Sequence, residues 1–346
     1  MSVLNNGLKS SWDKVVWDKG HPFQSFSMLK LFEDNWKGDF VPYHIYYEDS
    51  ENKSLIPLYF YKNCPRLDYY KNKAGGFRHN IIMSHALVGW YGTPVYSSFK
   101  ALKKSLSQAY ELARDKNSAL FFAGIDVRNI DLVNFLKKEG FKLCEFHSIT
   151  VRNLQNIDGD PTKYLSKKRR GRVRSCINKA ILSGVTLDSY KKIYRSKVTE
   201  LIHNILIEDG VDSDVLPKEF IFSLLDNGPK GLDVLVAVSP LGEPIGVHIN
   251  FYWNNKYYIW LAGHNRSLLK EYQQSHFLFE ESIKRALMLN CKEIHAGRDP
   301  YEPKIQHGFE KIPLLAAIKA EDPIINDQAA KWLMGLEQRH NELYKL

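Results

Sequence analysis

The densest run of positive charge in the sequence is Lys167–Arg174, in which six of eight residues are cationic. On a helix, Arg170 and Arg174 share one face with Lys167, and Arg172 lies between them in the sequence. Such a run can neutralise the phosphates of tRNA, a nucleotide or coenzyme A. The alternative is a solvated helix between domains. We favour phosphate binding, because the run lies where two domains are expected to form a cleft.

A second group of polar residues follows the predicted strand Lys292–Ala296. Ligands of open α/β sheets gather at such strand ends. Arg298 is a candidate for holding a phosphate, and Tyr301 is a further candidate contact. Asp299 is a candidate for orienting or deprotonating an ammonium group. Because it precedes Pro300, Asp299 is also a favoured helix N-cap, which is the preferred interpretation and is compatible with the first.

Three more candidate contacts lie at the start of a predicted helix or in a loop that precedes it. Ser275 begins that helix, and the free N–H groups of a helix N-terminus bind anions such as a pyrophosphate. The favoured alternative is that Ser275 serves only as the N-cap. His264 and Arg266 follow Ala262 in a predicted loop that we expect to face the same cleft.

The sequence gives no support to several other chemistries. The four cysteines are scattered without a Cys-x-x-Cys pair, which argues against a zinc site or a disulfide framework, so we expect no metal. No P-loop, Gly-x-Ser-x-Gly elbow or His-Glu-x-x-His motif occurs. His248 and His295 fall in predicted strands, where a hydrogen-bonded core histidine is more common than a catalytic one. The missing motifs argue against ATP-driven ligation, serine-hydrolase chemistry and zinc-peptidase chemistry.

The elements that position these residues fall into two halves. The polar, turn-rich stretch Asn153–Asp160 before Pro161 is typical of a connection between domains, so we predict one domain over 1–155 and a second, carrying the site, over 161–346. The first half predicts helices at Phe23–Trp36, Ser97–Lys116 and Asn129–Glu139, and strands at Phe40–Tyr47, Ser54–Tyr61, Ala119–Asp126 and Phe141–Leu154. The first two strands are expected to pair.

The second half predicts a similar order of elements. Its strands are Val185–Tyr190, Asp233–Val238, Pro244–Trp253, Lys256–Ala262, Lys292–Ala296 and Leu314–Lys319, and its helices are Tyr194–Glu208, Pro217–Asp226, Ser275–Asn290 and Glu302–Phe309. The alternation predicts an α/β protein with mixed central sheets.

Bulk properties set limits on partners and location. The chain has 346 residues, enough for two domains, and no stretch approaches the ~20 apolar residues that a membrane span needs. The N-terminal residues lack the apolar core of a signal peptide, so we expect a cytoplasmic protein. A net charge of +9 favours anionic partners: RNA, a nucleotide-linked substrate, coenzyme A or an anionic membrane face.

Three segments carry a resemblance to a known family. They are Arg169–Ala180 with Gly184 and Val185, Gly246–Ala262 with Ser275–Phe279, and Gly297–Phe309. In these segments, and in the order of elements, the chain resembles the tandem-GNAT FemABX-like peptidyltransferases and BioF2-like acyltransferases. The resemblance implies two tandem GNAT-like (acyl-CoA N-acyltransferase) domains. It also implies that Lys304 lies near the transfer site, where a fixed cation would stabilise an oxyanion. The alternative, which the sequence alone favours, is a solvated lysine on a short helix.

The resemblance implies an acyltransferase that forms an amide on an amine acceptor, such as a cell-wall precursor or a natural-product intermediate. Glu271–Ser275 stands where the usual GNAT pyrophosphate loop would lie. That departure and the basic run slightly favour aminoacyl-tRNA as the donor over acyl-CoA or a carrier-bound thioester. No tightly bound cofactor is expected. The rival hypothesis is a non-catalytic RNA- or membrane-binding module that uses the basic 167–174 face.

Overall fold

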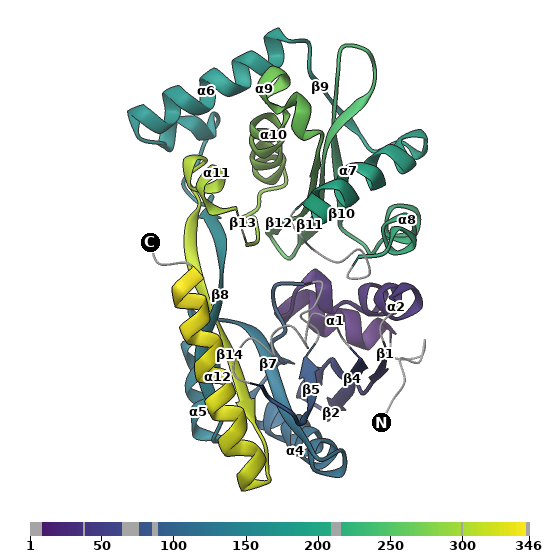
Figure 1. Cartoon of the computed structure of the whole chain (residues 1–346), viewed down its shortest axis with the longest axis vertical. Helices are drawn as coiled ribbons and strands as arrows, with labels where there is room; N and C mark the ends of the chain where they lie inside the picture. The colour runs from purple at the N-terminus through teal and green to yellow at the C-terminus, as the bar shows by residue number, and fades with distance from the viewer. Residues whose placement is uncertain are drawn as a thin grey trace. The chain divides into compact units, whose positions relative to one another are not determined.

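The computed structural model describes residues 9–36, 39–63, 76–84, 89–208, 216–298 and 300–343. The chain divides into two compact units. Figure 1 labels the helices and strands of each unit. Unit 1 comprises Met1–Ser148 and Ile312–Leu346, and unit 2 comprises Ile149–Lys311. Two strands, β8 (Lys142–Asn153) and β14 (Glu310–Lys319), each begin in one unit and end in the other.

Two consecutive domains would place the last part of the chain in the second domain. In the structure, Ile312–Leu346 belongs to unit 1 instead. The physical reason is strand pairing: β14 runs antiparallel to β7 (Ser118–Asp126), with Ile318 opposite Phe121. Helix α12 (Pro323–Leu343) then packs Trp332 against Phe121 and Phe77, with ring centroids 5.5 and 5.3 Å apart. The C-terminal segment therefore completes the core of unit 1.

The sheet of unit 1 is mixed, with strand order β1-β4-β5-β7-β14. Its further elements are α1 (Lys9–Lys19), α2 (Phe26–Asn35), β1 (Asp39–Pro42), β2 (Ile45–Glu48), β3 (Lys53–Ile56), β4 (Leu58–Asn63), β5 (Asn80–Ser84), β6 (Val95–Tyr96), α4 (Phe99–Asp115) and α5 (Ile130–Lys138). Strands β2, β3 and β6 form a separate small sheet.

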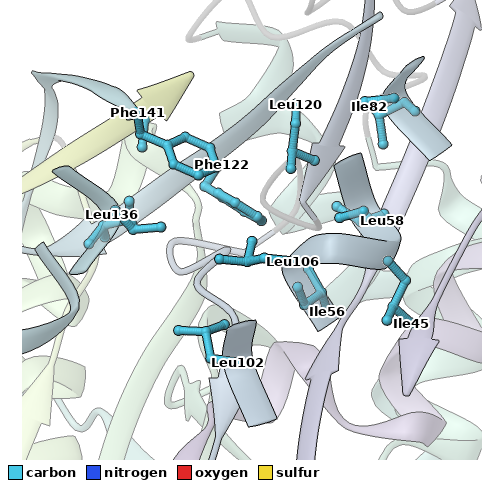
Figure 2. Packing of buried hydrophobic residues seen from close by; sticks show 14 of the residues in the cluster. Ile45, Ile56, Leu58, Ile82, Leu102, Leu106, Leu120, Phe122, Leu136 and Phe141 are labelled. Carbon is cyan, nitrogen blue, oxygen red and sulfur yellow. The ribbon is translucent and has the colours of Figure 1, made fainter. Parts of the chain in front are cut away.

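Successive apolar side chains of β7 point to alternate faces of the unit 1 sheet, and both faces are covered by helices. Leu120 and Phe122 lie among Leu106 and Leu136 of α4 and α5 (Figure 2). Phe121, between them, faces α12 instead. Because successive side chains of a strand point to opposite faces, this nearly continuous apolar run fits a strand buried on both sides, as the sequence predicts.

The two predicted strands near the start of the chain are each split in two. The β2–β3 hairpin is present with the expected loop, but β1 pairs with β4 in the other sheet. The predicted pairing is confirmed, since Phe40 lies opposite Tyr61 and Ile45 opposite Ile56, but it is divided into two short ladders in different sheets. Pro57 separates β3 from β4, and because proline has no backbone N–H it cannot continue a strand ladder.

Unit 2 also holds a mixed sheet, with strand order β8-β13-β12-β11-β10-β9. Its elements are α6 (Lys167–Leu182), β9 (Thr186–Ser189), α7 (Arg195–Glu208), α8 (Lys218–Asn227), β10 (Leu232–Val238), β11 (Pro244–Trp253), β12 (Lys256–His264), α9 (Leu269–Tyr272), α10 (Gln274–Met288), β13 (Glu293–His295) and α11 (Tyr301–Gln306). The predicted meander β10–β12 is confirmed, and Asn254 and Asn255 form its tight turn with φ of 43° and 59°.

Helices α7 and α10 cover opposite faces of the meander (Figure 1). Gly263 of β12 lies against the backbone of Leu201 in α7, where an added Cβ would be 2.7 Å from the carbonyl carbon. Gly246 of β11 lies instead under Leu278 of α10. The polar residues of β11 that share the face of Gly246 therefore point toward α10.

Candidate functional site

Lys304 lies inside unit 2, in the last turn of the short helix α11 that follows β13. Lys304 is only 7% exposed, and its Nζ donates a hydrogen bond to the backbone carbonyl of Arg298. A buried ammonium is costly unless it is hydrogen-bonded, so its position is held by the chain around it. The sequence-predicted lysine is therefore a buried cation and not a solvated one.

Histidines from three elements surround this region. His248 of β11 is fully buried, with Nδ1 3.0 Å from Ser282 Oγ of α10, and its ring lies 5.8 Å from that of His264. Burial lowers the pKa of His248 well below its ordinary value, and the neighbouring His264, Lys304 and His307 act in the same direction. The prediction of a satisfied core histidine holds for Nδ1 alone, because Nε2 has no hydrogen-bond partner among the described residues.

His307 and His276 extend this group. His307 Nε2 and His276 Nδ1 share a hydrogen bond of 2.9 Å, and the two rings stack at 5.2 Å. Burial lowers the pKa of His307 to about 3 and that of His264 to about 4. Burial, followed by the charge of Arg172, lowers the pKa of His276. These imidazoles are therefore neutral at neutral pH.

Glu280 of α10 completes what we call the polar cluster: His248, His264, His276, Glu280, Lys304 and His307. Glu280 is 2% exposed, and its Oε2 has no hydrogen-bond partner among the described residues. Its Oε2 is 4.0 Å from His307 Nδ1. Burial raises the pKa of Glu280 to about 7, although Lys284 and Arg152 act to lower it. A carboxyl group with such a pKa can take or give a proton near neutral pH.

A cavity of about 450 Å³ opens beside Glu280. It is lined by Gly159, Asp160, Pro161, Thr162, Arg174, Ile177, Asn178, Glu280 and Lys284. Its wall is fixed by buried Arg152, whose two terminal nitrogens donate to the carbonyls of His307 and Pro161, each at 2.7 Å. The same side chain thus connects the turn after α11 to the cavity.

Strand β12 offers a second feature of the site. Its parallel pairing with β13 ends at Tyr258 opposite His295, yet β12 continues to His264. Between Ile259 and His264, β12 pairs with β11 among the described residues. Strands β12 and β13 therefore separate after Tyr258 and His295. His264 ends β12 beyond this point, and the chain that follows β13 leads to Lys304.

The predicted arginines of α6 differ in their engagement. Arg174 donates to Asp160 Oδ2 at 2.5 Å and to Thr162 Oγ1 at 2.9 Å, and Arg170 contacts the carbonyl of Lys163 at 3.4 Å. Burial acts to raise the pKa of Asp160, but hydrogen bonds from Thr162 and Arg174 outweigh it and hold the pKa at about 2. Arg172 is exposed on α6.

The remaining predicted residues are dispersed. Ser275 is the second residue of α10, and Gln273, in the left-handed conformation, takes the N-cap position. The favoured interpretation of Ser275 as the N-cap was therefore wrong. Arg266 forms an ion pair with Glu208 at 2.9 Å. His264 ends β12 and does not lie in the loop where it was expected.

Two predicted residues lie in the segment before Lys304. Arg298 is half-buried and supplies the carbonyl that accepts from Lys304. Tyr301 begins α11, and Lys311 Nζ lies 4.4 Å from its ring centroid. Asp299, the predicted base or cap, lies outside the described residues.

Glu280 was not predicted as a functional residue, although the sequence carries a signal for it. On α10, Phe277 precedes it by three positions and Ile283 follows it by three, and both are buried. Residues at this spacing share a helix face, so a carboxylate between two core residues is expected to be buried. His307 likewise gave no local signal, because only the fold brings it to α10.

The described residues lack two kinds of feature. Among them, no group of three or more His, Cys, Asp or Glu side chains is arranged to hold a metal ion, so the histidines of the polar cluster do not form such a group. No helix in the same part of the chain is long and apolar enough to cross a membrane.

Comparison with known proteins places this site in a family context. Residues 167–304 match the family model described as an acetyltransferase (GNAT) domain. No curated protein matches the chain.

Among solved structures, FemX is similar with a TM-score of 0.65 and 12% identity, covering 100% of this chain and 99% of FemX. The C-terminal domain of a proposed lysylphosphatidylglycerol synthetase from Agrobacterium fabrum has a TM-score of 0.62 at 11% identity, covering 97% and 98%. L-PGS from Bacillus licheniformis has a TM-score of 0.57 at 12% identity, covering 94% and 96%. These similarities confirm the predicted α/β class and the resemblance to tandem-GNAT proteins. Residues 167–304 are therefore an acetyltransferase (GNAT) domain in a chain with the fold of FemX, and the protein is an acyltransferase.

Proposed function

We propose that the protein forms an amide by transferring an activated aminoacyl or acyl group to an amine at the polar cluster of unit 2. The observation that carries the proposal is the buried ammonium of Lys304, within a GNAT domain and beside neutral histidines. Attack of an amine on an ester or thioester creates an oxyanion. A preorganised cation of this kind lowers the barrier by about 3 kcal/mol.

The geometry supports separate tasks for these residues. An ammonium group has three N–H donors, so Lys304 can make several hydrogen bonds, of which the one to the carbonyl of Arg298 fixes its position, and we propose that another forms with the reacting oxygen. Because His248 and His307 are neutral, they do not compete with Lys304 for that negative charge. Holding donor and acceptor together supplies most of the remaining rate, without a covalent enzyme intermediate.

Aminoacyl-tRNA is the favoured donor, with acyl-CoA or a carrier-bound thioester as the alternative. Helix α6 exposes Lys167, Lys168, Arg169 and Arg172 without an ion pair among the described residues, and such cations suit RNA phosphates. The name of the similar Agrobacterium fabrum protein also includes a lysyl group, which is an aminoacyl group. The acceptor we propose is an amine on a cell-wall precursor or a natural-product intermediate.

The donor is tested by two parallel incubations, each with a mixture of amine acceptors. One contains radiolabelled aminoacyl-tRNA and the other radiolabelled acyl-CoA. We expect an amide product in the first, abolished when the tRNA is digested by RNase beforehand. Product from acyl-CoA alone would overturn the choice of donor. RNA binding with no product from any donor would instead favour a non-catalytic module.

A further inference from the structure

Among the charged residues that line the cavity beside the polar cluster, Glu280 differs from the others in its hydrogen bonding. Asp160 and Arg174 bind one another across the wall, and Lys284 pairs with Glu281 at 2.7 Å. Glu280 Oε2 has no hydrogen-bond partner among the described residues although Glu280 is 98% buried. A buried polar atom without a partner is costly, and because Glu280 also lines the cavity, a ligand bound there that donates a hydrogen bond would remove this cost.

We infer that Glu280 receives the proton of the acceptor amine, which binds in this cavity as an ammonium group. The inference rests on the proposed function and deepens it by assigning the acceptor site. An ammonium suits the position, because it carries donors for Oε2 and a charge opposite to that of the carboxylate. The cavity volume of about 450 Å³ is sufficient for a small amine or for the end of a larger acceptor.

The chemical step balances as follows. The ammonium gives one proton to the Glu280 carboxylate and becomes a neutral amine with a free electron pair. Its nitrogen forms a bond to the donor carbonyl carbon, and the carbon–oxygen bond of the aminoacyl ester, or the carbon–sulfur bond of a thioester, breaks. The leaving group takes the second proton of the amine. One proton remains on Glu280 and must leave before the next turnover.

The histidine pair provides a route for that proton. His307 Nδ1 is 4.0 Å from Glu280 Oε2, and His307 Nε2 is hydrogen-bonded to His276 Nδ1. A neutral imidazole can accept a proton on one nitrogen while releasing one from the other. Because His276 is half-buried while His307 is fully buried, the pair leads from the interior toward solvent.

Other charged groups around Glu280 determine how its titration responds. They are Arg152 from β8, Asp160 and Arg174 from the cavity wall, Lys284 and Glu281 from α10, and His307 after α11. Burial raises the pKa of Glu280 to about 7, and the nearby cations act in the opposite direction. A bound ammonium adds one more positive charge, so it is expected to lower that pKa.

The first test measures binding without turnover. Protein labelled with ¹³C at the glutamate carboxyl carbon is titrated by NMR, with and without propylammonium, for the natural chain, Glu280→Gln and Glu281→Gln. We expect a carboxyl that titrates near pH 7, is missing only from Glu280→Gln, and shifts down by about one pH unit when propylammonium is added. A midpoint that propylammonium leaves unchanged would overturn the inference, whatever the outcome for turnover.

The second test uses whichever donor gives turnover. We expect Glu280→Gln to lower the single-turnover rate by about 10²–10⁴-fold with an alkylamine acceptor and to remove the rise in rate around pH 7, with donor binding unchanged. Methoxyamine, which is unprotonated at neutral pH, is expected to react at similar rates with both chains. Glu281→Gln is the matched control.

The two tests separate the possible failures. Equal loss with alkylamine and methoxyamine would mean that Glu280 has a structural role and would overturn its role as proton acceptor. If no donor gives turnover but propylammonium shifts the Glu280 midpoint, the proposed function fails while the ammonium site stands.

Discussion

At the scale of single residues, unit 2 places buried groups of opposite charge in one polar cluster. Lys304 is fixed by the carbonyl of Arg298, whereas Glu280 Oε2 lacks a hydrogen-bond partner among the described residues. Burying either group reduces stability unless it has a partner. Glu280 is kept at such a cost with its pKa raised by burial to about 7, and groups of this kind are typical of functional sites.

The cost of burying Glu280 is measurable through its pH dependence. Its folded pKa of about 7 exceeds the ordinary value of 4.5, so its contribution to stability is fully present below pH 4.5 and is lost as the pH rises through 7. Glutamine does not titrate. We therefore expect the free energy of unfolding of Glu280→Gln, relative to the natural chain, to rise by about 3 kcal/mol between pH 4.5 and pH 8.

Urea denaturation at several pH values checks this expectation, with Glu281→Gln as the matched control. If the difference in free energy of unfolding between Glu280→Gln and the natural chain stays constant with pH, then ionisation of Glu280 does not destabilise the folded protein.

Residue chemistry could be predicted from the sequence only where a local pattern carried it. Lys304 was singled out by its place in Gly297–Phe309, and it is buried as the hypothesis requires. Contacts between distant segments gave no such signal: Arg174 is engaged by Asp160, and His307 meets His276 across 31 positions. Sequence periodicity reports which face a residue occupies, and not its partner on another element.

At the scale of elements, helix α6 combines a packed and a charged side. Val173, Ile177 and Ala180 are buried, while Lys167, Lys168, Arg169 and Arg172 are exposed. Arg174 and Arg170 contact the chain itself, so Lys167, Lys168, Arg169 and Arg172 are better candidates for phosphate contacts than those two arginines.

We therefore predict that Arg169→Gln/Arg172→Gln weakens the binding of charged tRNA. Each phosphate contact contributes roughly 0.7–0.9 to the slope of log affinity against log salt concentration, so the double substitution is expected to lower that slope by about 1.5. Filter binding between low and physiological salt measures it. The control, Lys137→Gln/Lys138→Gln on α5, removes the same charge from exposed positions. Equal slopes for the α6 variant and the control would exclude α6 from RNA contact.

Most elements were predictable because their patterns are local. The apolar stripe of α10, the meander and the Asn254–Asn255 turn all appear where they were expected. The division of the strand pair Phe40–Tyr47 and Ser54–Tyr61 between two sheets was not predictable, because it depends on tertiary contacts. The start of α10 before Ser275 was not predictable either, because it depends on a left-handed residue at Gln273. Glutamine at such a position carries no local signal.

At the scale of the whole molecule, each unit has its own core, and the chain crosses between them at β8 and β14. Unit 1 depends on a segment that follows unit 2 in the sequence, since α12 contributes buried Ile325, Ala329, Trp332, Leu333 and Leu336. Element order alone does not predict this return, because an α/β alternation is also compatible with two consecutive domains.

A chain that ends at residue 320 tests this arrangement. It keeps β14 but lacks α12, which exposes Phe121 and Phe77 on unit 1. Since each large buried side chain contributes about 1.5–3 kcal/mol, we expect the truncation to destabilise unit 1 by several kcal/mol. Hydrogen exchange is expected to show lost protection in β5 and β7 and retained protection in β11 and α10. Equal loss in both units would contradict independent cores.

The most direct test of the account is the single-turnover rate of amide formation by Lys304→Met, which keeps the side-chain length but removes the ammonium. With the donor saturating, we expect a loss of about 10²–10³-fold and unchanged donor affinity. The control Lys311→Met removes a lysine that contacts Tyr301 outside the polar cluster. A folded Lys304→Met protein that forms the amide as fast as the control would contradict the claim that this buried cation stabilises the transition state.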